Sequence, residues 1–295
     1  MDEIIYYEIP VLNRPYLIAG FEGWPNAAEV SSLSIQHLVE ILKAKKFASI
    51  PMENYYQMSS NRPTAIIKDG RLIELIHPGN HFYYSKDAIG KDLILFSGIE
   101  PHLRWNVFAD FFLDFAKRFA VPRIFTLGGT YDYIPHTHPT VVSALFNQES
   151  LREEVVEAGL NLTEYTGPIS IHTFLQEAAR KRKLEAISLW GHAPQYLQAR
   201  NIKVVYGVLK KLNELMKTEI DLSRLENASD YFDHQVNDLV SQDPKLQEII
   251  NKLEEAYQKS GRPFPFGKKE EPKEDKVVYI QAFLKRQEDE EKKEN

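Results

Sequence analysis

Residues 123–139, RIFTLGGTYDYIPHTHP, decide the fold that the sequence predicts. The apolar, β-prone side chains of residues 124–127 predict a strand. Gly128-Gly129 predicts a sharp turn at its end, because glycine tolerates positive φ. A polar loop follows, with His-Thr-His at residues 136–138. Polar groups delivered from the carboxyl end of an apolar strand are typical of an α/β site, but a surface turn that happens to hold two histidines explains the residues equally well.

A strand and a helix are predicted directly upstream. Residues 92–96 form a short apolar run that is broken at Gly98. Residues 103–119 carry aromatic and aliphatic side chains at helical spacing, at positions Val107, Phe108, Phe111, Phe112, Phe115 and Phe119. The order strand, helix, strand predicts a parallel sheet covered by helices.

The first part of the chain repeats this alternation. Residues 4–9 and 15–21 predict strands on either side of a proline turn. Asn26 stands at a helix N-cap position, and Glu29 completes a capping-box pattern before a helix that runs to about Lys45.

The rest of the chain adds a hairpin and more helices. Residues 64–75 predict a hairpin about the Asp69-Gly70 turn. The further predicted elements are helices over 149–158, 170–183, 201–217 and 227–259 and a strand over 184–190. Asp243-Pro244 predicts an interruption of the last helix, with Asp243 as the cap of a new start.

We expect three parts in the chain. They are an α/β core domain over residues 1–225, a helical extension over 226–267 that ends in GRPFPFG, and a charged, flexible tail over 268–295. The tail contains one apolar run, VVYIQAFL, at residues 277–284.

Composition excludes several classes of protein. The 295 residues are 43% hydrophobic, which suffices for a buried core. The net charge of −6 offers no broad basic face for nucleic acid, and the absence of cysteine excludes disulfides and thiolate chemistry. The first residues lack a secretory pattern, and no apolar run approaches the ~20 residues of a membrane span. We therefore expect a soluble, cytoplasmic protein without nucleic-acid or membrane partners.

Separated segments of the chain resemble the proteasome assembly chaperone two family over residues 4–225. The segments that carry the resemblance are GFEGWPNAAE (20–29), FSGIEPHLRWNVFADFFLDFA (96–116), LGGTYDYIPHTHP (127–139), YTGPISI (165–171) and LWGHAPQYL (189–197).

The resemblance implies a fold and a type of partner, but no settled chemistry and no cofactor. It implies a three-layer α/β domain with a mostly parallel sheet flanked by helices, similar to nucleoside phosphorylases and peptidyl-like hydrolases. A homo-trimer and a role in assembling proteasome rings are further expectations. Archaeal relatives dock through a C-terminal hydrophobic-tyrosine tail, whereas this chain ends EEKKEN and has only an internal Val277-Val278-Tyr279 run.

Three positions depart from the family pattern. Asn26 stands where the family has Asp, His138 where it has Arg, and Gln195 where it has His. The departures remove a carboxylate, make a fixed cation titratable and remove an imidazole. They argue against transferring an enzymatic activity to this chain.

We expect one polar pocket at the carboxyl ends of the strands. Its candidate residues are Glu22, Gly23, Trp24, Asn26, Glu100, Arg104, Trp105, Gly128, Gly129, His136, Thr137, His138 and His192. His136 and His138, one residue apart, can share a metal with Glu22, Glu100 or His192, although a pair of hydrogen-bonded loop histidines is the simpler interpretation. We expect no metal.

The other candidates also have two interpretations. Gly128-Gly129 can present backbone N–H groups to an anion, or only turn the chain. Glu22 and Glu100 can act as general acid and base with a histidine, or Glu22 can bind local backbone and Glu100 can begin a helix. Arg104 can hold an anion or pair with Glu100.

The tryptophans also have two interpretations, and the serines lack a catalytic motif. Trp24, Trp105 and Trp190 either line the pocket or belong to the core. No serine lies in a GxSxG context, so the sequence does not support an ordinary serine hydrolase.

Two functional hypotheses follow. The first is a non-enzymatic, homo-oligomeric protein-binding factor of the assembly-chaperone type. The alternative is a small-molecule binder or a hydrolase- or phosphorylase-like enzyme that uses Glu22, Gly128-Gly129, His136 and His138.

Overall fold

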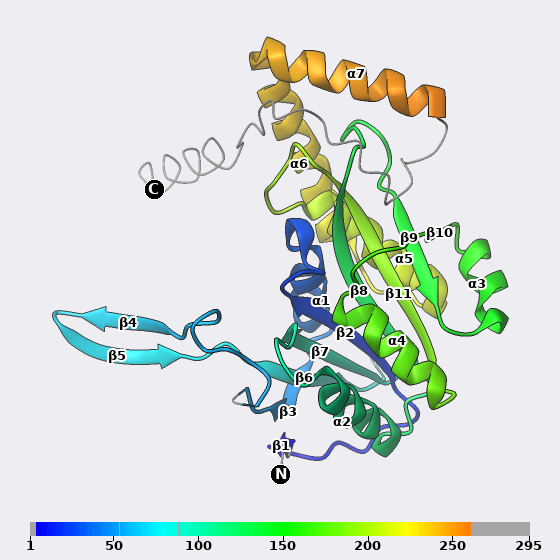
Figure 1. The fold of residues 1–295 in the computed structure, drawn as a ribbon. Helices are drawn as coiled ribbons and strands as arrows, with labels where there is room; N and C mark the ends of the chain where they lie inside the picture. The colour runs from blue at the N-terminus through cyan, green and yellow to red at the C-terminus, as the bar shows by residue number, and fades with distance from the viewer. Residues whose placement is uncertain (1–3, 53, 88, 261–295) are drawn as a thin grey trace.

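A single large sheet forms the body of the protein in the computed structural model, which describes residues 4–52, 54–87 and 89–260. Within these residues the sheet comprises β1 (Ile5–Tyr6), β2 (Tyr16–Glu22), β3 (Lys45–Ile50), β6 (Asn80–Ser85), β7 (Leu93–Ile99), β8 (Arg123–Asp132), β9 (Val142–Phe146), β10 (Asn161–Leu162) and β11 (Glu185–Pro194). Their order across the sheet is β1-β3-β6-β7-β2-β8-β11-β9-β10 (Figure 1).

The centre of the sheet is parallel. Strands β7, β2, β8 and β11 run in the same direction, whereas β6, β3 and β1 on one side and β9 on the other are antiparallel to their neighbours. The prediction of parallel strands from the order strand, helix, strand is therefore confirmed for the centre of the sheet.

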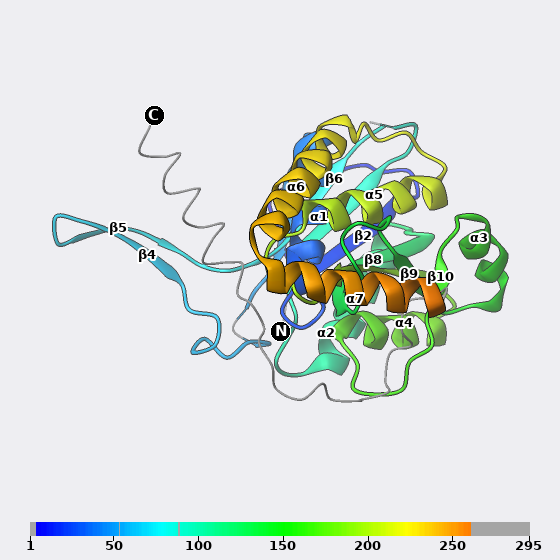
Figure 2. The same ribbon diagram turned by 90° about the horizontal axis from the view of Figure 1, so that it is seen from above.

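Helices cover both faces of the sheet. Their bounds are α1 (Val30–Ile41), α2 (Trp105–Arg118), α3 (Arg152–Glu157), α4 (Ile171–Lys181), α5 (Ile202–Met216), α6 (Ser223–Gln242) and α7 (Pro244–Ser260). Helices α1 and α5 lie on one face and α2 and α4 on the other (Figure 2), which confirms the three-layer α/β fold. Among the residues that the structure describes, none of the helices has the length and apolar content to span a bilayer.

The phenylalanine stripe of α2 explains why that helix forms and where it packs. Phe108, Phe112 and Phe115 are almost wholly buried against the sheet. Phe115 stacks on Phe82 of β6 with ring centroids 3.9 Å apart. Burial of each such ring contributes roughly 1.5–3 kcal/mol, so this face of the sheet is anchored by aromatic packing.

The prediction that strand 123–127 ends at a glycine turn is wrong. Strand β8 continues through Gly128-Gly129 to Asp132, and neither glycine has positive φ. Gly129 instead allows close packing, because an added Cβ would lie 2.3 Å from the carbonyl oxygen of Ala27. Strand β7 likewise continues through Gly98 to Ile99.

Other local predictions were partly wrong. The predicted strand 4–9 is ordered as a strand only at β1, which pairs with β3. The capping box does not form: Asn26 accepts the N–H of Ser32, and the Glu29 carboxylate binds Arg200. Strands β3, β6 and β9 were not predicted at all.

The predicted helices at 103–119, 170–183 and 201–217 are confirmed by α2, α4 and α5. The predicted interruption near Pro244 is also confirmed, since Asp243 Oδ1 accepts the N–H of Lys245 at 2.9 Å. The predicted tail and its VVYIQAFL run lie outside the described residues.

The predicted hairpin at 64–75 is confirmed as β4 (Thr64–Lys68) and β5 (Arg71–Ile76), joined by Asp69-Gly70. These two strands form a sheet of their own. They extend away from the body in both ribbon views (Figures 1 and 2).

Candidate functional site

The carboxyl edge of the central strands brings together three loops. Glu22 ends β2, Glu100 follows β7, and α4 begins at Ile171 beside them. The side chain of Glu100 joins these loops: its two carboxylate oxygens accept the N–H of Trp24 at 3.2 Å and of Ile171 at 2.8 Å. The Ile171 N–H is the first of α4, where a carboxylate is favoured by the helix dipole.

Both carboxylates at this edge bind protons more readily than usual. Burial raises the pKa of Glu100, although the bonds from Ile171 and Trp24 act against that shift. Partial desolvation, followed by repulsion from Glu29, raises the pKa of Glu22. Gly23 between them has φ +106°, which brings the backbone close to Glu100.

Asn26 and Gly129 are brought together, but not as an anion site. Gly129 N–H donates to the carbonyl of Pro25 at 2.8 Å, and Asn26 pairs with Gly129 as an isolated parallel bridge. An anion at Gly128-Gly129 is therefore not supported, because the Gly129 N–H already has a backbone acceptor.

The His-Thr-His loop is bound to the C-terminal helices. The backbone N–H of His136 donates to the Tyr196 hydroxyl, which donates in turn to Nδ1, and Nε2–H donates to Asn237 Oδ1 at 3.1 Å. Thr137 donates to Glu254 at 2.7 Å, and the ring of His138 lies 4.6 Å from that of Tyr257 on α7.

The two histidines have different surroundings in this loop. Burial lowers the pKa of His136, consistent with a neutral imidazole in this network. Within the described ranges, no three His, Asp, Glu or Cys side chains are close enough to hold a metal. The His136 ring is hydrogen-bonded to Tyr196 and Asn237, and the His138 ring packs on Tyr257.

The tryptophans have three different environments. Trp24 is 59% exposed, so it does not belong to the core. Trp105 packs against Phe174 and donates to the carbonyl of Pro101, and Trp190 packs on the buried ring of His172. The guanidinium of Arg104 lies 6.0 Å from the centre of the Tyr55 ring.

His192 belongs to a constellation that sequence reasoning missed. Its Nδ1–H donates to Asp132 Oδ2 at 2.8 Å, and its Nε2 accepts the hydroxyl of Ser143 at 2.9 Å. The three side chains come from neighbouring strands β8, β11 and β9, and all are buried. The carboxylate, imidazole and hydroxyl groups are hydrogen-bonded in the same sequence as in the Ser-His-Asp triad of serine hydrolases.

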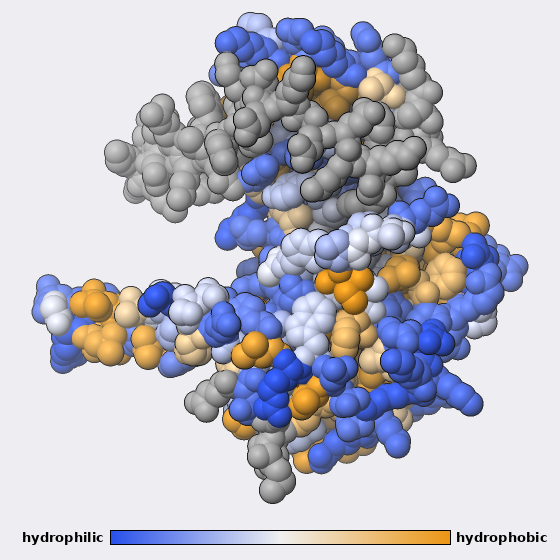
Figure 3. All heavy atoms as spheres, viewed as in Figure 1, coloured by the Kyte–Doolittle hydropathy of each residue, from blue (hydrophilic) through white to orange (hydrophobic). Residues whose placement is uncertain are grey.

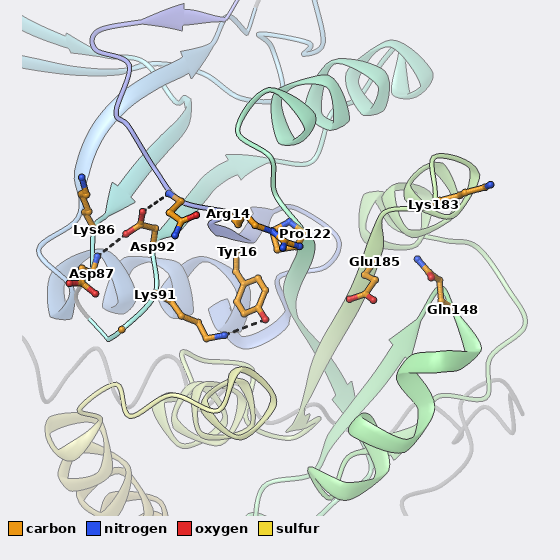
Figure 4. Close-up of a pocket in the computed structure, with 12 residues that line it drawn as sticks. Arg14, Tyr16, Lys86, Asp87, Lys91, Asp92, Pro122, Gln148, Lys183 and Glu185 are labelled. Atoms are coloured by element: carbon orange, nitrogen blue, oxygen red, sulfur yellow. Dashed lines mark hydrogen bonds between the residues drawn. The ribbon is translucent and has the colours of Figure 1, made fainter.

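A pocket lies at the opposite, amino end of the central strands (Figure 4). It is open and measures about 770 Å³. Asp92 within it accepts the N–H groups of Asn13 and Asp87, and Glu185 binds Arg123. These acids serve to fix strand ends, and no candidate from the sequence lines this pocket.

Comparison with known proteins gives a family and several similar structures. The sequence profile of the PAC2 family matches residues 20–240. No functionally curated protein matches the chain.

The similar structures extend over most of the fold. A PAC2 family protein of Streptomyces avermitilis is 30% identical, with a TM-score of 0.71 over 80% of this chain and 99% of that one. A proteasome-assembly chaperone homologue of Mycobacterium tuberculosis is 26% identical, with a TM-score of 0.73 over 80% and 99%. PbaB, a proteasome activator of Pyrococcus furiosus, is 23% identical and shares the fold, with a TM-score of 0.64 over 80% and 98%.

Proposed function

The chain belongs to the PAC2 family, and on that premise we propose that it is a cytoplasmic, homo-oligomeric protein-binding factor of the assembly-chaperone type. The family resemblance favours a trimer. The M. tuberculosis relative, described as a proteasome-assembly chaperone homologue, supports the class of function. We also propose that α6 and α7 form an extension that covers the His-Thr-His loop.

The observation that carries the proposal is an exposed apolar surface where the sequence suggested a catalytic pocket. Trp24, Leu103 and Ile169 are 59%, 46% and 45% exposed, and we call them the rim patch. Glu100 holds their loops together through its bonds to Trp24 and Ile171. Figure 3 shows apolar side chains among polar ones on the face of α2 and α4.

The composition of the rim patch suits a protein partner. Exposed tryptophan beside aliphatic side chains is typical of interface centres, where it supplies much of the binding energy. The polar groups at the same edge are engaged by the protein itself, as Glu100 and His136 illustrate. They position the loops and leave the apolar surface for recognition.

We expect Trp24→Glu to reduce recovery of a protein partner at least about tenfold, because a buried aromatic anchor contributes about 2 kcal/mol or more. The measurement is affinity purification from the source cells followed by quantitative mass spectrometry. Tyr231→Glu is the matched control, since Tyr231 on α6 is 60% exposed and outside the rim patch. The proposal predicts at least one protein that is lost with Trp24→Glu and retained with Tyr231→Glu. If no recovered protein behaves in this way, the proposal is contradicted.

The constellation of Ser143, His192 and Asp132 favours a second candidate function, hydrolysis of small esters. In such a reaction the Ser143 oxygen attacks the acyl carbon and its proton passes to His192 Nε2, while Asp132 orients the ring. The ester C–O bond then breaks, and the departing alcohol takes the proton from His192. Water, which gives a proton to the same imidazole, releases the acyl group from Ser143 as the acid. The serine is only 7% exposed and lies within strand β9, so a substrate must be small.

A fluorophosphonate tests this second candidate. If Ser143 is nucleophilic, its oxygen forms the bond to phosphorus and fluoride leaves, which adds the phosphonyl mass to the peptide that contains residue 143. Ser143→Ala abolishes that label, whereas Ser188→Ala, at a buried serine that bonds to Thr126, leaves it unchanged. An unlabelled residue 143 in the folded protein would remove this candidate.

A further inference from the structure

The sequence beyond the described residues contains a strongly apolar run. It is VVYIQAFL at residues 277–284, in which every side chain except Gln281 is aliphatic or aromatic. Transfer of such side chains from water to an apolar surface is favourable by about 25 cal/mol per Å². The run therefore favours contact with an exposed apolar surface.

We propose that residues 277–284, which we call the tail run, bind the rim patch of their own chain and so compete with the protein partner. The inference rests on the proposed function, because it describes how the same patch is regulated. Trp24, Leu103 and Ile169 supply the exposed apolar surface. The tail run supplies two aromatic rings, Tyr279 and Phe283, of the kind that pair with an exposed tryptophan.

Helix α7 places the start of the tail at the same edge of the sheet as the rim patch. Thr137 donates to Glu254 at 2.7 Å, and the His138 ring lies 4.6 Å from that of Tyr257 in the last turn of α7. This loop follows the carboxyl end of β8, and α7 lies beyond that end (Figure 1). Trp24 follows the carboxyl end of β2, which is a parallel neighbour of β8.

The chain is long enough to make this contact. Pro25, next to Trp24, accepts the N–H of Gly129 at 2.8 Å, and residues 129–138 extend at most about 32 Å to the loop that binds α7. The 16 residues from 261 to 276 can extend about 53 Å. Tethering gives an effective concentration on the order of 1 mM, so the contact needs little intrinsic affinity.

Charge complementarity supports the tail run as the occupant. Glu22, two residues before Trp24, is partly desolvated and repelled by Glu29. Within the described chain, no hydrogen bond or ion pair engages its carboxylate. The tail run has Lys276 before it and Lys285 after it, so it brings a cation toward this carboxylate together with its apolar side chains.

Cross-linking of the full chain tests the contact. p-Benzoylphenylalanine in place of Trp24 keeps an aromatic side chain, and its photoexcited ketone inserts into a C–H bond of the group that lies against it. We expect the main cross-linked product to contain residues 277–284. The same replacement of Tyr231, which is 60% exposed on α6, is the matched control and should give at least about tenfold less of that product, because it is outside the rim patch.

Tyr279→Glu tests the same contact with the natural Trp24 in place. The charge weakens binding of the tail run, so acrylamide should quench the tryptophan fluorescence more strongly. Partner recovery in the affinity purification should rise at least about threefold, because a larger fraction of rim patches is free. Asn295→Glu makes the same charge change outside the tail run and should alter neither measurement.

Three results would overturn the inference. Equal cross-linking from positions 24 and 231 would show proximity through the tether and no specific contact. In a mixture of light and nitrogen-15-labelled chains whose subunits have exchanged, cross-links that join the two labels would assign the tail run to a second copy. Unchanged quenching and recovery with Tyr279→Glu would leave the rim patch without regulation by the tail.

Failure of this inference is distinguishable from failure of the proposed function. If Trp24→Glu loses a partner but Tyr279→Glu has no effect, the proposed function stands and the tail contact is rejected. If residues 277–284 cross-link specifically to position 24 but no partner is recovered from any variant, the tail contact stands and the proposed function is contradicted.

Discussion

Gly129→Ala is expected to lower the free energy of unfolding by about 3 kcal/mol or more. The added Cβ meets the carbonyl oxygen of Ala27 at 2.3 Å and the Cβ of Val30 at 2.8 Å, and backbone there has little room to move. The Gly129 N–H bond to Pro25 holds the strand against that loop. Urea unfolding followed by circular dichroism measures the loss.

Gly128→Ala is the matched control. Its added Cβ would meet ring carbons of Trp190 at 3.0 Å and of His172 at 3.2 Å, which are side-chain atoms that can shift. We expect a smaller loss, about 1 kcal/mol. If both variants lose equal stability, close backbone packing is not the reason for Gly129.

These glycines show the limit of reading the fold from sequence. The central strands and several helices were readable because apolar spacing is a local property, as in the phenylalanine stripe of α2. A glycine pair, however, reads the same in the sequence whether the chain turns there or another backbone segment packs closely against it. The neighbour here, Ala27 to Val30, lies about a hundred residues earlier in the chain, so the sequence near Gly129 contains no sign of it.

The candidate site was predictable to the same extent. The placement of Glu22 and Glu100 at one sheet edge follows from parallel strands. The partners of His136 were not predictable, because Asn237 belongs to a helix that packs on the loop only in the folded chain. Ser143 was missed for a similar reason: it lies in an unpredicted strand, and no GxSxG motif marks it.

The buried ring of His172 is expected to make the protein sensitive to acid. The ring is fully buried beside Phe21 and Trp190, and neither nitrogen has a hydrogen-bond partner within the described part of the chain. Burial lowers its pKa from 6.5 to about 3. Above pH 6.5 the ring is neutral in both the folded and the unfolded chain, so it adds no pH dependence there.

Below pH 6.5 the unfolded chain binds a proton that the folded chain rejects until about pH 3. Stability therefore falls as the pH falls, by up to about 1.4 kcal/mol per pH unit from this group. We expect His172→Leu to remove that dependence. The free energy of unfolding of the variant, relative to that of the unchanged chain, should therefore be about 2 to 3 kcal/mol higher at about pH 4.5 than at about pH 7.5. Urea unfolding at both pH values measures the difference.

His172→Met separates titration from packing, because both variants lack an ionisable group but fill the site differently. At neutral pH the free energies of unfolding of the two variants should differ, because leucine and methionine pack differently in the site. Both variants should be stabilised by the removal of a buried imidazole whose nitrogens have no hydrogen-bond partners. Their dependence on pH should be the same, since it reflects only the missing proton. If both variants retain the acid sensitivity of the unchanged chain, the His172 ring accepts its proton in the folded protein. The cause of acid unfolding would then lie elsewhere, for example at His81. Burial lowers the pKa of His81 to about 4.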